Sequence, residues 1–131
     1  MLLSRAAEAA LKALPLLDPR GPLAQGNETR ALAVACGEPA PYLGKVLQKL
    51  ARAGLLRSKR GRTGGFVLGR PASEITLADV VLAVEGAESL EALLAVPEGP
   101  AGTFLVPGRD ELAARLRGTT LARLRRESAR P

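Results

Sequence analysis

The chain has 131 residues, 19 basic and 13 acidic side chains, no histidine and one cysteine. This length is enough for one hydrophobic core but not for two independent domains, and no apolar run approaches the ~18 residues of a membrane span. An enzyme is not expected, because the sequence has no histidine, no cluster of metal ligands and no serine or cysteine beside a base.

The first predicted element is a helix rich in alanine and leucine, which Ser4 caps and Pro15 interrupts. Ser4 and Arg5 stand at its start, where a helix favours contact with a phosphate. The segment carries charges and lacks the unbroken apolar centre of a signal peptide, and a single cysteine permits no disulfide within the chain. We therefore expect a cytoplasmic protein without a membrane segment.

Two further helices are predicted after a turn-rich connection. Thr29 is expected to cap a short helix that ends at Gly37, and a turn over residues 36–42 leads into a third helix, Ala40 to Arg52. Two helices joined by such a turn make a helix-turn-helix unit, in which the second helix reads DNA.

The third helix has an apolar face and a basic face. Its apolar residues recur at helical spacing and predict a buried stripe: Leu43, Val46, Leu47 and Leu50. Lys45, Lys49 and Arg52 are left on the outward arc. Gly54 marks the end of the helix.

Two short strand-like runs follow, over residues 55–59 and 66–70. The glycines between them allow the positive φ angles of a hairpin loop, so Arg60 and Arg62 are expected on a projecting tip. A helix fits the major groove and a basic hairpin can reach the backbone or the narrower groove, which is the geometry of a winged helix. A nucleotide-binding loop is not favoured, because such a loop follows a buried strand and opens a helix.

Basic charge is concentrated in residues 39–73, which contain no Asp or Glu. The basic residues of this segment are Lys45, Lys49, Arg52, Arg57, Lys59, Arg60, Arg62 and Arg70. Together these residues carry more positive charge than the net charge of +6 of the whole chain, so the positive field belongs to one segment. A nucleic acid is the expected partner; the alternative is an ordinary solvated surface.

The C-terminal third is expected to hold two helices and a loop. A fourth helix begins at Thr76, which forms a capping box with Asp79. Residues 87–108 are predicted to be a loop, because their prolines and glycines break helices; it either closes a small-molecule pocket or acts as a passive linker. A last helix covers residues 109–126, with a break at 118–120 and a stripe of four leucines: Leu112, Leu116, Leu121 and Leu124.

Three motifs, YL..VLQKL.RAGL, SKRG..GGF.L.RP and EITLADVV.AVEG, closely resemble the Rrf family of bacterial winged-helix transcription regulators. The resemblance covers residues 1–86 and 109–126. It implies a mainly α fold with a small β-hairpin, divided into a winged helix-turn-helix domain over residues 1–86, a Pro/Gly-rich loop over 87–108, and a C-terminal dimerisation helix and tail over 109–131.

The resemblance also implies which residues contact DNA. Near the start of the reading helix, Pro41, Tyr42 and Lys45 are candidates for contacts with bases or backbone, and Lys49 for a phosphate. Arg60 matches a wing arginine that enters the minor groove. The full set of expected DNA-binding residues is Ser4, Arg5, Pro41, Tyr42, Lys45, Lys49, Arg57, Lys59, Arg60 and Arg62.

At two positions on the reading helix, Gly44 and Tyr42, the expected contact with DNA is not settled by the resemblance. Some relatives carry an acidic base-reading side chain where this chain has Gly44, so their operator sequence does not carry over. The ring of Tyr42 either contacts DNA or packs between helices with its hydroxyl in water.

The redox-sensing members of the family hold an iron-sulfur cluster through three cysteines after the fourth helix. Residues 87–108 contain no Cys and no His, whereas a cluster needs about three or four ligands, so no cofactor is expected. Cys36 is interpreted as a small, partly buried apolar residue; an intermolecular disulfide or a sensor thiol is the alternative.

The family's dimer element corresponds to the last helix, so Leu112, Leu116, Leu121 and Leu124 are expected at the interface of a homodimer. Alternatively, this stripe closes the core of a single chain.

Three functions remain. The leading one is a sequence-specific transcriptional regulator, a repressor by resemblance, that binds a near-palindromic double-stranded DNA operator as a homodimer without an iron-sulfur cluster. A small-molecule effector would be a further partner. The alternatives are a nucleic-acid binder without sequence preference and a winged-helix protein-interaction module.

Overall fold

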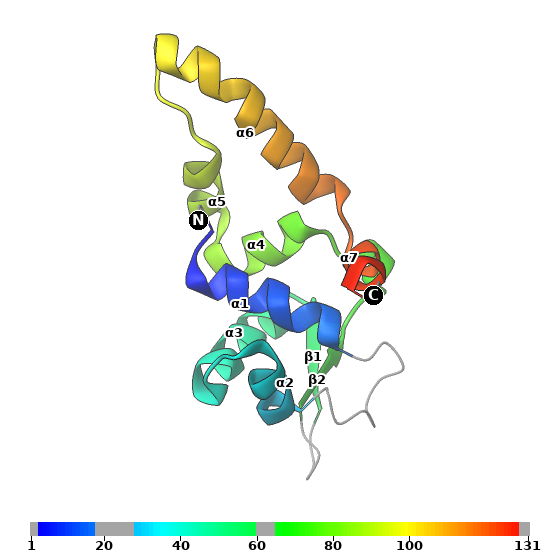
Figure 1. The fold of residues 1–131 in the computed structure, drawn as a ribbon. Coiled ribbons are helices and arrows are strands. Elements are labelled where there is room, and N and C mark those ends of the chain that lie inside the picture. The colour runs from blue at the N-terminus through cyan, green and yellow to red at the C-terminus, as the bar shows by residue number, and fades with distance from the viewer. Residues whose placement is uncertain (1–2, 18–27, 60–64, 129–131) are drawn as a thin grey trace.

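The computed structural model describes residues 3–17, 28–59 and 65–128 (Figure 1). Its elements in chain order are α1 (Arg5–Ala13), η1 (Leu14–Leu16), α2 (Thr29–Cys36), α3 (Ala40–Arg52), β1 (Leu56–Lys59), β2 (Gly65–Leu68), η3 (Ala72–Glu74), α4 (Leu77–Glu85), α5 (Ala87–Leu94), α6 (Pro100–Gly118) and α7 (Leu121–Ser128). This mainly helical fold with one antiparallel hairpin confirms the predicted fold class. Among the described helices, none combines the length and apolarity needed to cross a membrane.

Helix α1 lies between α3 and α4 and contacts both (Figure 1). Ser4 caps it as predicted, because its hydroxyl oxygen accepts the N–H of Ala7 at 3.1 Å. The helix buries only alanines, among them Ala9 and Ala10, so that neighbouring helices can approach closely. It ends at Ala13 and passes into the 3-10 turn η1, which contains Pro15, the residue predicted to interrupt the helix.

The turn between α2 and α3 is set by Gly37. This residue adopts φ 72°, a left-handed conformation that favours glycine, and the N–H of Glu38 then bonds the carbonyl of Ala33 at 3.0 Å. The prediction that Thr29 caps α2 was wrong by one position: Thr29 is the first helical residue, and Glu28 occupies the cap without a side-chain hydrogen bond.

Helix α3 buries the predicted stripe of Leu43, Val46, Leu47 and Leu50 in the main core. Gly54 turns the chain at φ 82° into the hairpin. Leu56 on β1 faces Leu68 on β2, and the pairing continues to Lys59 and Gly65. The hairpin tip, residues 60–64, lies outside the described residues, so the placement of Arg60 and Arg62 stays a prediction.

Helix α4 begins with the predicted capping box. The Thr76 hydroxyl accepts the Asp79 N–H at 3.1 Å, and the Asp79 carboxylate accepts the Thr76 N–H at 3.0 Å. Val80, Val81 and Val84 are buried on its inner face.

The predicted loop over residues 87–108 was wrong. The segment forms α5 and the first half of α6, which begins at Pro100 and not near residue 109. Pro100 occupies the first turn, where its missing N–H costs nothing, and Pro107 removes one hydrogen bond on an exposed side of the helix. Gly102 is buried against the carbonyl of Pro97, where a Cβ would collide with it.

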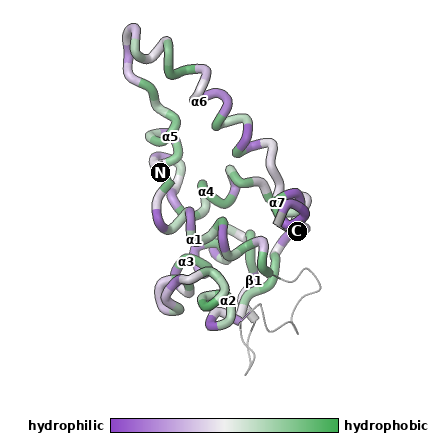
Figure 2. Tube along the Cα trace, viewed as in Figure 1, coloured by the Kyte–Doolittle hydropathy of each residue, from purple (hydrophilic) through white to green (hydrophobic). Residues whose placement is uncertain are grey.

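Helices α5 and α6 form an arm that extends away from the winged helix and returns to it (Figure 1). The predicted break at residues 118–120 is confirmed, since α6 ends at Gly118 and α7 starts at Leu121. There the Leu121 N–H bonds the Ile75 carbonyl at 2.7 Å, and the Leu77 N–H bonds the Thr119 carbonyl at 2.9 Å. Figure 2 shows that α7 is largely hydrophilic, yet Leu121 is only 1% exposed and belongs to the main core.

Candidate nucleic-acid interface

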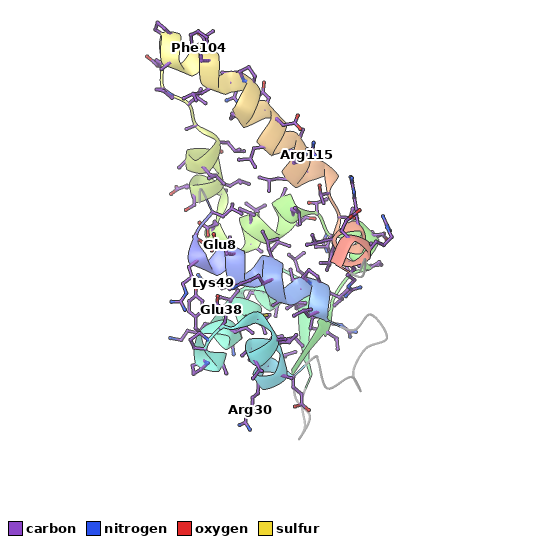
Figure 3. All side chains as sticks on the ribbon, viewed as in Figure 1. Glu8, Arg30, Glu38, Lys49, Phe104 and Arg115 are labelled. Atoms are coloured by element: carbon purple, nitrogen blue, oxygen red, sulfur yellow. The ribbon has the colours of Figure 1, made fainter. Side chains whose placement is uncertain are left out.

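The outward face of α3 is exposed and basic. Pro41, Lys45, Lys49 and Arg52 are exposed, and the opposite face is the buried leucine stripe. Glu38 and Lys49 lie at the end of the molecule far from the arm tip, which Phe104 marks in Figure 3. The structure thus brings Pro41, Lys45 and Lys49 onto one accessible helix face.

Tyr42 is half-buried, and its ring packs against the core. The guanidinium carbon of Arg5 lies 4.5 Å from the ring centroid, in the geometry of a cation–π contact. This arrangement favours the packing interpretation of Tyr42 over direct contact with a base.

Ser4 and Arg5 differ in how free they are to meet a phosphate. The Ser4 hydroxyl caps α1 and also donates to the carboxylate of Glu85 at the end of α4, so it faces the protein. The Arg5 side chain is 65% exposed. Of this predicted pair, Arg5 is the accessible member.

On the hairpin, Arg57 is exposed on β1. Lys59 is the last residue of that strand, and its side chain, like the whole of Arg60 and Arg62, is outside the description. At the hairpin base, Arg70 approaches Asp79 of the α4 capping box at 4.0 Å. The wing base is therefore linked to the start of α4.

Sequence reasoning missed the role of Glu38. Its carboxylate receives a hydrogen bond from Lys12 at 3.0 Å and one from Arg5 at 3.2 Å. The Lys12 bond and then Arg5 lower the pKa of Glu38, so the ion pairs persist above the ordinary pKa of Glu and weaken as the pH falls through the lowered value. Arg5 and Lys12 are two helical turns apart, so it was predictable that they share one face of the helix. Their shared partner Glu38 was not predictable, because it lies in a turn far away in the sequence.

Gly44 occupies the interior of α3 with room beside it. A Cβ there would meet only the Cγ2 methyl of Thr29, at 3.8 Å.

We expect Gly44→Ala to raise the free energy of unfolding by about 0.5–1 kcal/mol, because alanine loses less backbone entropy in a helix. Urea denaturation measures the change. Gly69→Ala is the control that must destabilise, since its Cβ would lie 2.6 Å from the Gly54 carbonyl oxygen; a loss of stability in Gly44→Ala would contradict the expectation.

The four leucines predicted at a dimer interface are not equivalent. Leu116 is 5% and Leu121 1% exposed within one chain. Leu124 is half-buried against the main core, and Leu112 is half-buried beside α5. Leu116 and Leu121 are therefore buried within a single chain, and the placement of the four leucines at a dimer interface stays a prediction.

The most exposed large apolar side chain of the described residues lies at the tip of the arm. Phe104 is 85% and Leu105 52% exposed (Figure 3). Beside them, α5 and α6 enclose an open groove of about 480 Å³. Its lining is mostly aliphatic and consists of Leu93, Leu94, Ala95, Val96, Leu105, Gly108, Arg109 and Leu112. The arm thus carries a projecting aromatic ring and an apolar groove close together.

The residues do not fit an iron-sulfur cluster. The chain has one cysteine and no histidine, and the described segments contain no group of three or more His, Cys, Asp or Glu that could hold a metal. Cys36 is half-buried against the core, and burial raises the pKa of its thiol, which disfavours the reactive thiolate.

Comparison with known proteins agrees with this geometry. The Rrf2 family, described as "Iron-dependent Transcriptional regulator", matches residues 3–127. The chain is 38% identical over 71 residues to the HTH-type transcriptional regulator IscR of Photorhabdus laumondii. Those 71 residues cover 54% of this chain and 38% of that protein. The chain spans about half or less of the length of the curated relatives it matches.

Two solved structures are similar over nearly the whole chain. CymR, the global cysteine regulator of Bacillus subtilis, superimposes with a TM-score of 0.79 at 27% identity, covering 95% of this chain and 96% of that one. Staphylococcus aureus CymR gives a TM-score of 0.73 at 30% identity, covering 93% and 96%. By its sequence, its helix-turn-helix and its hairpin, the chain belongs to the Rrf2 family of transcriptional regulators.

Proposed function

We propose that this protein is a transcriptional regulator that binds a specific DNA operator as a homodimer. The observation that carries the proposal is the face of α3, where Lys45, Lys49 and Arg52 are exposed opposite a buried leucine stripe. They lie in a segment, residues 39–73, without a single carboxylate. Such a face attracts phosphates and repels basic partners.

In this proposal α3 enters the major groove with its N-terminal half facing the bases. Lys45 lies near the bases, and Lys49 and Arg5 contact phosphates. The hairpin reaches the adjacent backbone or minor groove with Arg57, Lys59, Arg60 and Arg62. Some relatives carry an acidic side chain at position 44 and this chain has Gly44, so the operator sequence of those relatives is not carried over to this chain.

The arm formed by α5 and α6 is proposed as the dimer interface. The most exposed large apolar side chain of the described residues, Phe104, lies beside an apolar groove, so two copies can exchange this contact symmetrically. The dimer then presents two reading helices to half-sites about 34 Å apart, which makes the operator an approximate palindrome. Repression follows if that operator overlaps a promoter. A small-molecule effector that binds this groove would compete with the dimer contact.

The test is fluorescence anisotropy on the DNA immediately upstream of the protein's own coding region, beside a scrambled duplex of equal length, across a salt series. We expect binding at least about a thousandfold tighter to the upstream duplex, and a slope of log K against log salt of about −5 to −8. Equal but steeply salt-dependent binding to both duplexes would replace the proposal by sequence-blind nucleic-acid binding. A flat salt response would favour a protein-interaction module.

Lys49→Ala is expected to weaken binding to the upstream and scrambled duplexes by the same factor. A lysine that contacts a phosphate supplies charge but no sequence information, so the loss of one lysine from each protomer of the dimer should reduce the magnitude of the salt slope by about 2. The same anisotropy titrations measure both quantities. Arg117→Ala is the control, because it removes an exposed cation at the C-terminal end of α6. It should leave the affinity for both duplexes and the salt slope unchanged. Unaltered binding by Lys49→Ala would remove this residue from the interface.

A further inference from the structure

Glu38 is the last acidic residue before the basic segment, and it lies one residue ahead of Pro39, the N-cap of α3. Its backbone is fixed by the turn, because its N–H bonds the Ala33 carbonyl at 3.0 Å. Its side chain is only 8% exposed, although it sits among cations that are 50–65% exposed. The carboxylate is thus held on the inner side of the surface proposed to face DNA.

The two carboxylate oxygens of Glu38 have different partners. Oε1 accepts from Nζ of Lys12 at 3.0 Å, and Oε2 accepts from Nη2 of Arg5 at 3.2 Å. Nζ of Lys12 also donates to the carbonyl of Cys36 at 3.3 Å, at the end of α2. One side chain therefore connects α1 to the turn that precedes the reading helix.

Arg5 extends this connection to α3. Its guanidinium is bonded to Glu38 on one edge and stacked on the ring of Tyr42, 4.5 Å from the centroid. A guanidinium has five donors in a rigid plane, so Arg5 keeps N–H groups free for a phosphate while Glu38 and Tyr42 fix its orientation. Without Glu38, Arg5 would still be attracted to DNA but would no longer have one preferred position.

We propose that Glu38 is a specificity-determining positioning residue, which orients Arg5 and the start of α3 and lowers the attraction of this surface for any phosphate. The inference rests on the proposed DNA-binding function. Glu38 then affects the affinity for DNA in two opposite ways. The orientation favours DNA whose bases fit α3, and the negative charge disfavours DNA in general. Both widen the difference between operator and random duplex.

Two substitutions separate the charge from the orientation. Glu38→Gln keeps the size and removes the charge, so affinity for the scrambled duplex should rise about fivefold at low salt, and the salt slope should steepen by about 1 to 2 as two cations are released. Glu38→Asp keeps the charge but shortens the side chain, so that it cannot reach Arg5 and Lys12 together. Its affinity for the upstream duplex should fall about tenfold, which is roughly the worth of one hydrogen bond to a charged group, with scrambled binding unchanged.

The experiment uses the anisotropy titrations on both duplexes, with circular dichroism melts to show that each variant is folded. Glu88→Gln is the matched control, because it makes the same change of charge at an exposed position on α5; its ratio of upstream to scrambled affinity should stay at the wild-type value. The inference is overturned if Glu38→Gln matches Glu88→Gln in scrambled binding and salt slope, or if Glu38→Asp keeps wild-type affinity for the upstream duplex.

The outcomes also separate this inference from the function on which it rests. Wild-type protein that binds the two duplexes equally would refute sequence-specific binding, and the specificity role of Glu38 with it, before any variant is compared. Wild-type protein that prefers the upstream duplex, with an unchanged ratio in both Glu38 variants, would leave the proposed function standing and refute only the role of Glu38.

Discussion

Phe104→Asp is expected to turn the proposed dimer into a monomer at micromolar concentration. Phe104 is 85% exposed in the single chain, so an acidic residue there leaves the monomer's core intact. Aromatic side chains at the centre of an interface cost about 2–4 kcal/mol when removed, which weakens dimerisation by about 30-fold to 1,000-fold. Sedimentation velocity measures the change. Operator affinity should fall with it, since a monomer contacts one half-site.

A matched control is Val34→Asp, which places the same charge at an apolar residue that is 80% exposed on α2. It should remain dimeric, because α2 lies at the opposite end of the molecule from the arm tip (Figure 1). If Phe104→Asp also sediments as a dimer, the interface lies elsewhere than the tip of α6.

Leu116→Asp is expected to destabilise the folded chain strongly. Leu116 is 5% exposed within one chain. Removing a leucine from a core lowers the free energy of unfolding by about 2–5 kcal/mol, and a buried unpaired carboxylate lowers it further. A domain of this size is stable by only about 5–15 kcal/mol, so the loss is a large fraction of the total. A thermal melt should show a transition lowered by about 10 °C or more.

Ala114→Asp serves as the control for Leu116→Asp, because Ala114 is exposed on the same helix. Its melting temperature should stay close to that of the wild type. A Leu116→Asp protein that melts normally and sediments as a monomer would instead mean that Leu116 belongs to the dimer interface and that its burial in the single chain is unimportant.

The winged helix was predictable because its signals are local. The stripe from Leu43 to Leu50, the glycine after α3 and the box formed by Thr76 and Asp79 each lie within one or two helical turns. Their spacing alone therefore fixes which side is buried. The basic face of α3 followed from the same pattern, since the positions that remain outside the stripe carry the cations.

The arm was not predictable in the same way. Pro107 and the glycines around it oppose a helix locally, yet they lie inside α6, and Gly102 is needed where the helix passes the carbonyl of Pro97 in the preceding connection. Helix α6 also packs on α4, and tertiary packing overrides helix propensity, which is a weak guide for single residues. The pairing of Glu38 with Arg5 and Lys12 was hidden for the same reason, because the partners are 33 and 26 positions apart in the sequence.

Helix α7 has a consequence for how the protein is made. Its Leu121 completes the core that also contains Leu43, and Arg125 donates to the carbonyl of Leu17 at 2.6 Å. During translation the reading helix therefore leaves the ribosome long before the residue that closes the core beneath it. The nascent winged helix stays incomplete, with apolar surface open to aggregation, until α7 has been synthesised. A chain that stopped just after Gly118 would lack Leu121 and would leave this part of the core open to water.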